Sequence, residues 1–141
     1  MNDLSRLYRE TIKQHAAEPV GFRGEIDATH ENEADNPLCG DRILIQLKIR
    51  DGQVEAAAFD GEACAICTAS ASLLCENITG QPVEHLLQLH SQLQAALTDS
   101  APGGSTENSE PPELRPLLGV KPFPSRIRCA LLPWIAAKNA L

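Results

Sequence analysis

The stretch ILIQLKIRDGQVEAAAF, residues 43–59, decides the fold. Between residues 43 and 49 every second residue is isoleucine or leucine, and this alternation indicates a half-buried strand. The Asp-Gly pair at 51–52 is a strong two-residue hairpin turn. A returning strand follows at 54–59, so the stretch predicts an antiparallel hairpin.

The segments on either side of the hairpin predict helices. Residues 3–17 place apolar side chains at helical spacing, residues 64–78 are rich in alanine, serine and leucine, Pro82 opens a third helix, and a last helix follows Pro124. Residues 22–30 show a thin alternation that could form a further strand, and the polar segment 31–41 is expected to be a loop. The order of helix, strands and helices predicts an α+β fold with an antiparallel sheet.

Length and composition fit one domain spanning residues 1–141, with a flexible surface loop near 98–113. The longest apolar stretch, Ala130 to Ala137, is too short to span a bilayer. The N-terminal residues are amphipathic and lack the apolar core of a secretion signal. We therefore expect a cytoplasmic protein with no membrane partner.

The charge is unevenly distributed along the chain. The net charge is −7, yet residues 114–141 contain five basic residues and no acidic one. A general nucleic-acid binder needs a dominant basic face. The acidic balance therefore argues against a nucleic-acid partner.

Five cysteines form the most informative set of side chains. Their number is odd, and disulfide frameworks are rare in the cytosol, so metal binding or thiol chemistry is expected. Cys39 and Asp41 come just before the hairpin, and Cys64 comes just after it. The outer ends of a hairpin meet at one edge of the sheet, so these three residues are expected to lie close together. Three thiolates and one carboxylate, with Cys129 included, suit zinc or the edge of an iron–sulfur cluster, although separate buried cysteines are an equal alternative at this point.

Two local features bear on the helical cysteines. Cys64 and Cys129 are expected near the N-termini of their helices, where exposed N–H groups lower the pKa of a thiol. Pro133 lacks the N–H that would bond the carbonyl of Cys129. A kink after Cys129, or a regular helix that begins only near Pro133, is therefore expected.

Three blocks, NPLCGDRI (36–43), FDGEACAICTASAS (59–72) and FPSRIRCALLPW (123–134), together resemble the SufU branch of the IscU/NifU-type iron–sulfur cluster assembly proteins. The resemblance covers nearly the whole chain in the right order. It implies an N-terminal helix, a small antiparallel sheet of about three strands, and helices packed on one face. It further implies that Cys39, Asp41, Cys64 and Cys129 are metal ligands and that Arg126 lies beside the site.

The same resemblance implies a zinc-dependent sulfur acceptor that takes persulfide sulfur from a pyridoxal-phosphate-dependent, SufS-like cysteine desulfurase and serves a downstream iron–sulfur assembly scaffold. A scaffold that builds a transient [2Fe–2S] cluster on the same residues is the alternative, and a binding module with a purely structural zinc is a third. Whether such a sulfurtransferase-like acceptor is itself an enzyme stays open. A zinc-bound thiolate is a weak nucleophile, so one ligand must leave to accept sulfur. Cys39 is the candidate acceptor because its loop moves at low cost.

Two positions depart from the family pattern, because Ala63 and Cys67 stand where the family usually has glycine and serine. Cys64-x-x-Cys67 on its own would suggest a redox pair, but the surroundings are not a βαβ unit. Cys67 could instead be a spare ligand or a resolving thiol. A small buried hydrophobic residue is the preferred interpretation.

Overall fold

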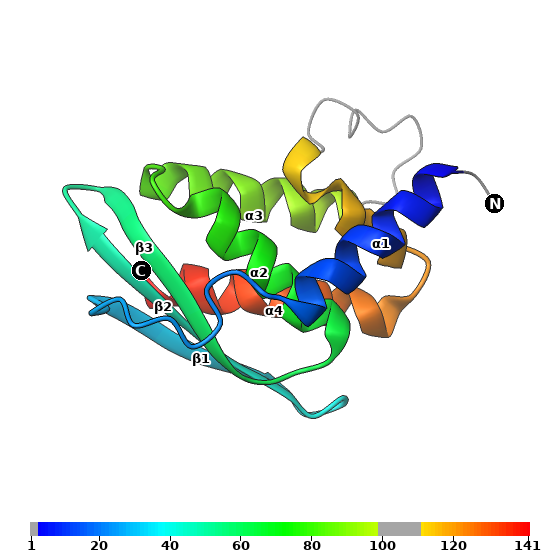
Figure 1. Cartoon of the computed structure of the whole chain (residues 1–141), viewed down its shortest axis with the longest axis horizontal. Coiled ribbons are helices and arrows are strands. Elements are labelled where there is room, and N and C mark those ends of the chain that lie inside the picture. The colour runs from blue at the N-terminus through cyan, green and yellow to red at the C-terminus, as the bar shows by residue number, and fades with distance from the viewer. Residues whose placement is uncertain (1–2, 99–110) are drawn as a thin grey trace.

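The structure, a computed structural model, describes residues 3–98 and 111–141. The element order is helix, three strands, then helices (Figure 1). The elements are α1 (Asp3–Ala17), β1 (His30–Asn36), β2 (Asp41–Arg50), β3 (Gln53–Glu62), α2 (Ala65–Ile78), α3 (Val83–Thr98), the 3-10 helix η2 (Pro112–Val120) and α4 (Pro124–Ala140). This order confirms the predicted α+β class.

The three strands form one antiparallel sheet in the order β1-β2-β3. The predicted hairpin is confirmed as β2 and β3, which pair Ile45 with Phe59. The turn residues Asp51 and Gly52 have φ values of 52° and 75°. Two successive positive φ angles match the twist of a tight hairpin, and glycine adopts them without steric cost.

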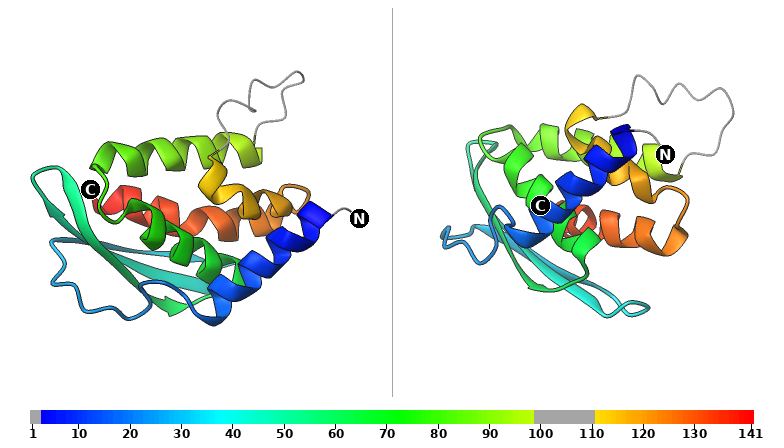
Figure 2. Two further views of the ribbon diagram at one scale, coloured as in Figure 1. Left: turned by 45° about the horizontal axis from the view of Figure 1, so that its top comes forward. Right: turned by 45° about the vertical axis from the view of Figure 1, so that its right-hand side comes forward.

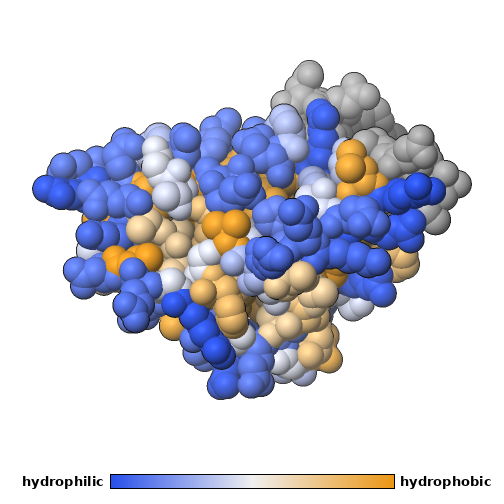
Figure 3. All heavy atoms as spheres, viewed as in Figure 1, coloured by the Kyte–Doolittle hydropathy of each residue, from blue (hydrophilic) through white to orange (hydrophobic). Residues whose placement is uncertain are grey.

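The helices cover one face of the sheet, as predicted (Figures 1 and 2). Ile43, Ile45 and Leu47 of β2 are fully buried in the core that the sheet shares with the helices. Helix α4 packs against β1 and β2, while α2 packs against β3. On the face shown in Figure 3, hydrophilic residues dominate and hydrophobic residues form small separate patches.

Two predictions for the segment before the hairpin are wrong. Residues 22–29 form no strand, and His30 instead begins β1. Phe22 makes only an isolated bridge to Phe59, because Arg23 and Asp27 adopt positive φ angles of 57° and 56° that interrupt extended backbone. Most of the polar segment predicted as a loop is instead strand β1. Its backbone pairs with β2 at the edge of the sheet, where polar side chains can stay in water.

The four predicted helices are confirmed as α1, α2, α3 and α4. The prediction does not include η2, which begins at Pro112, the second residue of the proline pair 111–112. Of the predicted flexible loop, residues 99–110 lie outside the described residues, Thr98 ends α3, and residues 112–113 open η2. No helix within residues 3–98 and 111–141 is long and apolar enough to cross a membrane.

A buried serine joins α1 to α2. The Oγ of Ser72 accepts a hydrogen bond from the Val20 backbone N–H at 2.7 Å and lies 2.7 Å from Nδ1 of His15. The other ring nitrogen of His15 is 3.5 Å from Glu76. This Ser-His-Glu chain has the residue types of a hydrolytic triad, but Ser72 is 0% exposed, so it fixes the position of α1 instead.

Helix α4 runs without interruption from Pro124 through Pro133, so the predicted late start near Pro133 is wrong. Trp134 is fully buried and donates from Nε1 to the Oγ of Ser70 at 3.0 Å. Ser70 in turn donates to the carbonyl of Ala130 at 2.5 Å. These bonds tie α4 to α2 one turn beyond Cys129.

Candidate metal centre

Asn36 organises the loop that carries Cys39. Its carbonyl accepts the backbone N–H groups of Cys39 and Gly40 at 3.2 and 2.9 Å. Its side-chain oxygen accepts the N–H of Leu38 at 3.2 Å, and its Nδ2 donates to the Sγ of Cys39 at 2.9 Å. Gly40 completes the turn with a φ of 72°. The Cys39 thiol is therefore exposed but held in place.

The ends of the hairpin bring Asp41 and Cys64 together, as the topology predicts. Asp41 is only 3% exposed, and its Oδ1 accepts the backbone N–H of Cys64 at 2.8 Å. Its Oδ2 lies 3.5 Å from the Sγ of Cys64. Cys64 is the N-cap of α2, where its Sγ accepts the N–H of Cys67 at 3.4 Å. The carboxylate thus anchors the start of the helix that carries the second thiol.

Cys129 approaches the same point from the second turn of α4. Its Sγ lies 3.6 Å from the Sγ of Cys39 and 3.5 Å from the carbonyl of Ser125. The expected lowering of the Cys129 pKa is wrong: burial, then hydrogen bonds to Asp41, Cys64 and Cys39, raise it well above its usual range. The residue lies one turn too far into α4 to meet the free N–H groups of the helix start.

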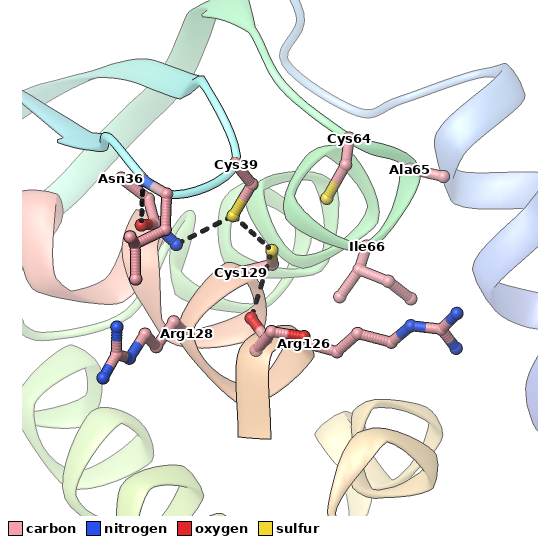
Figure 4. A pocket seen from close by; sticks show the side chains of 10 residues that line it. Asn36, Cys39, Cys64, Ala65, Ile66, Arg126, Arg128 and Cys129 are labelled. Atoms are coloured by element: carbon pink, nitrogen blue, oxygen red, sulfur yellow. Dashed lines mark hydrogen bonds between the residues drawn. The ribbon is translucent and has the colours of Figure 1, made fainter. Parts of the chain in front are cut away.

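All four predicted ligands therefore gather at one place. The donor atoms of Cys39, Asp41 and Cys129 lie within 4.8 Å of one another, and Cys64 contacts the same carboxylate. Figure 4 shows the three sulfur atoms directed toward a common space. The loop before β2, the first residue of β2, the cap of α2 and the second turn of α4 each supply one donor.

Two of the donor–donor distances match those of a tetrahedral zinc ion, although the Sγ of Cys64 lies outside the group of donor atoms that are all within 4.8 Å of one another. Zinc–sulfur and zinc–oxygen bonds of about 2.3 and about 2.0 Å place two sulfurs about 3.8 Å apart and a sulfur and an oxygen about 3.5 Å apart. The corresponding distances here are 3.6 Å between Cys39 and Cys129, and 3.5 Å between Cys64 and Asp41. The thiol-rich donor set also matches the preference of zinc over harder cations.

Arg126 and Arg128 line the cavity of about 540 Å³ in front of the donors. Their guanidinium groups extend away from the sulfur atoms on opposite sides (Figure 4). Arg126 lies over the ring of Phe123, 4.9 Å from its centroid. The two arginines therefore make the rim of the cavity basic without contacting the donors.

Cys67 and Cys75 do not join the site as exposed thiols. Cys67 is 0% exposed; burial, followed by the negative charges of Asp41, Cys64 and Cys39, raises its pKa. Burial raises the pKa of Cys75 to about 12. The interpretation of Cys67 as a small buried hydrophobic residue fits this environment best.

Two notable residues lie outside the set that the sequence predicts. Asn36 was not singled out, although asparagine before proline is a turn signal that could have revealed its role. His90 is also absent from the predicted set: it is 5% exposed and its Nε2 has no hydrogen-bond partner among the described residues. On α3, His90 and its chain neighbour Leu89 are both buried.

Comparison with known proteins agrees with this geometry. The NifU-like N terminal domain pattern matches residues 7–130. The chain belongs to this family. Across 99% of its length it is 34% identical to the zinc-dependent sulfurtransferase SufU of Bacillus subtilis, covering 92% of that protein. It is 35% identical over 96% of its length to the iron–sulfur cluster assembly scaffold protein IscU of Thermotoga maritima, again covering 92%.

The fold of this NifU-like domain also occurs in solved structures. A crystal structure of a putative iron–sulfur cluster assembly scaffold protein for the SUF system, from Fervidobacterium islandicum, superposes with a TM-score of 0.78 at 25% identity and covers 93% of each chain. These matches confirm the resemblance and the fold that the three sequence blocks predict.

Proposed function

We propose that this NifU-like domain is a zinc-dependent sulfur-transfer protein of cytoplasmic iron–sulfur cluster assembly, accepting persulfide sulfur from a pyridoxal-phosphate-dependent cysteine desulfurase. The carrying observation is the contact between an exposed loop thiol, Cys39, and the buried donors Asp41 and Cys129. A site that served only to hold the fold together would not need a donor at the surface. The Bacillus subtilis relative is named a zinc-dependent sulfurtransferase, which supports the same proposed function.

Cys39, Asp41, Cys64 and Cys129 would hold the zinc ion. Bound zinc would keep the thiols deprotonated at neutral pH and shield them from oxidation. Asp41 has a second task, because the hydrogen bond from the Cys64 N–H to its Oδ1 fixes the carboxylate and leaves Oδ2 facing the sulfur. Such a bond to a ligand that faces a metal sets its orientation.

The transfer step needs only thiol exchange. The Cys39 thiolate attacks the outer sulfur of the donor's cysteine persulfide, the donor's S–S bond breaks, and the donor cysteine leaves as a thiolate. The outer sulfur is then carried by Cys39 as a persulfide, with no net oxidation or reduction. The Nδ2 of Asn36 lies 2.9 Å from the Sγ of Cys39, so it stabilises negative charge on the Sγ of the attacking thiolate. The persulfide would next pass to a downstream assembly scaffold.

A single substitution tests this function. Cys39→Ser should abolish the stimulation of a cysteine desulfurase and the mass gain of one sulfur atom on the chain. Cys75→Ser, at a buried thiol outside the donor set, is the matched control and should retain both. A Cys39→Ser protein that stimulates fully would contradict the acceptor role. A wild-type chain that unfolds without zinc yet stimulates no desulfurase would indicate a purely structural zinc.

The scaffold alternative rests on the Thermotoga maritima relative, which is named an assembly scaffold, and on the same four donors. A [2Fe–2S] cluster would then be the cargo of these residues. Anaerobic reconstitution with iron and sulfide, followed by elemental analysis, separates the two functions. Zinc that iron does not displace supports transfer, whereas a cluster formed at the expense of zinc supports the scaffold.

A further inference from the structure

A second cavity adjoins the metal centre between α1, η2 and the start of α4. Its volume is about 440 Å³, and it shares Ile66 and Arg126 with the cavity in front of the donors. We call it the basic groove; the lining residues that matter here are Ile12, Lys13, Ile66, Val120, Phe123 and Arg126. The shared residues make it a continuation of the metal centre along the surface.

The walls of the basic groove are apolar. Ile12 and Ile66 are half-buried against the core, and Val120 is 5% exposed. Phe123 is 47% exposed, so its ring is available to a neighbour. An exposed phenylalanine beside partly buried aliphatic side chains is the composition of a contact surface.

The rim of the basic groove is cationic. Lys13 and Arg126 line it together with Arg9, and no carboxylate is among the described residues that line it. Within residues 3–98 and 111–141, neither Lys13 nor Arg126 forms an ion pair with an acidic side chain. The chain as a whole has 19 acidic and 12 basic residues, so a rim without acids is opposite in sign to the molecule's average.

The side chain of Arg126 is directed toward the basic groove and away from the metal-site donors. Its guanidinium points away from the sulfur atoms and is held over the Phe123 ring at 4.9 Å (Figure 4). Stacking on an aromatic ring leaves the edge of a guanidinium free to donate to a carboxylate. The Ser72–His15 contact meanwhile fixes the helix that carries Lys13.

We propose that the basic groove docks an acidic segment of the sulfur-donor protein, with an apolar side chain between the walls and carboxylates on Lys13 and Arg126. Charge complementarity decides the occupant, because another copy of this acidic chain would meet long-range repulsion. The groove would thereby hold the donor beside Cys39. This proposal rests on the proposed sulfur-transfer function and identifies a docking surface for it.

The dissociation constant of the complex with the purified cysteine desulfurase, measured at low and high salt, tests the proposal. Lys13→Glu should weaken binding roughly 3- to 10-fold at low salt and reduce the salt dependence. Phe123→Ala should weaken binding at both salt concentrations, because it removes an apolar wall. Arg115→Glu, a charge reversal on an exposed residue of η2 outside the groove, should bind like the wild type.

The possible outcomes distinguish a failure of the docking proposal from a failure of the proposed sulfur-transfer function. If the wild type binds the desulfurase and Lys13→Glu has the same dissociation constant and salt dependence, the docking role of the groove is wrong while sulfur transfer stands. If the wild type binds no desulfurase, both are wrong. If Lys13→Glu instead changes the sedimentation of the chain alone, the groove is occupied by a second copy and the proposal fails.

Discussion

The Nδ2 of Asn36 lies 2.9 Å from the Sγ of Cys39, so a strand residue steadies the thiol at the tip of the following loop. The same side chain accepts the N–H of Leu38 through its oxygen. Asn36 is 7% exposed, so these bonds form largely out of water, where they contribute most.

Asn36→Ala should therefore loosen the Cys39 loop. We expect a loss of about 0.5–1.5 kcal/mol in the free energy of unfolding, because the side-chain hydrogen bonds of Asn36 to Leu38 and Cys39 are lost. Zinc affinity, measured by competition with a chelator, should also fall. Asn32→Ala, on the same strand and outside the site, is the control. An unchanged zinc affinity would show that the loop holds Cys39 without Asn36.

Cys67→Ala tests whether the extra thiol takes part in the site. Since Cys67 is fully buried, its loss should cost about 1 kcal/mol of stability through the small cavity it leaves. Zinc content by elemental analysis and persulfide uptake by mass spectrometry should both match the wild type. A Cys67→Ala protein that has lost its zinc would instead indicate that Cys67 is a zinc ligand.

Ser72→Ala should weaken the attachment of α1 to α2. The Val20 N–H loses its acceptor, which costs about 1–3 kcal/mol in the free energy of unfolding measured with urea. Hydrogen exchange of α1 should accelerate more than that of α3. Ser91→Ala, at an exposed position on α3, should change neither quantity.

His90 should make the fold sensitive to mild acid. Burial, followed by the positive charge of Lys138, lowers the pKa of His90 below its ordinary value of 6.5. Below that pH the unfolded chain binds a proton that the folded chain does not. The free energy of unfolding is therefore highest above pH 6.5, as far as His90 affects it. It decreases as the pH falls toward the lowered pKa of His90 in the folded state.

His90→Leu should reduce this pH dependence. Urea unfolding at about pH 7.5 and about pH 5.5 measures it, with His85→Leu on the same helix as the control. An equal loss of stability with acid in wild type and His90→Leu would assign the effect to other groups.

The sequence predicted the parts of the fold whose pattern is local. The alternation from Ile43 to Ile49 and the Asp-Gly turn specify the hairpin, because side-chain period and turn geometry agree there. Strand β1 was missed because its polar residues carry no strand signal, and only its pairing with β2 makes it extended. Pairing of this kind is a tertiary effect that propensity does not record.

Only part of the candidate metal centre could be predicted from local sequence patterns. The proximity of Asp41 and Cys64 follows from hairpin topology alone. The 3.6 Å contact between Cys39 and Cys129 joins residues 90 positions apart, so no local pattern reports it, and the family resemblance supplied that expectation. The pKa of Cys129 was misjudged because its depth in α4 and its burial depend on packing that the sequence does not display.

Strand β1 has a consequence for how copies of the protein meet. Glu31, Glu33 and Asp35 are exposed at alternate positions along β1, one of the two outer strands of the sheet. Two molecules that approached through this edge to extend their sheets would bring like charges face to face. The acidic residues that gave β1 no strand signal in the sequence therefore also disfavour edge-to-edge aggregation.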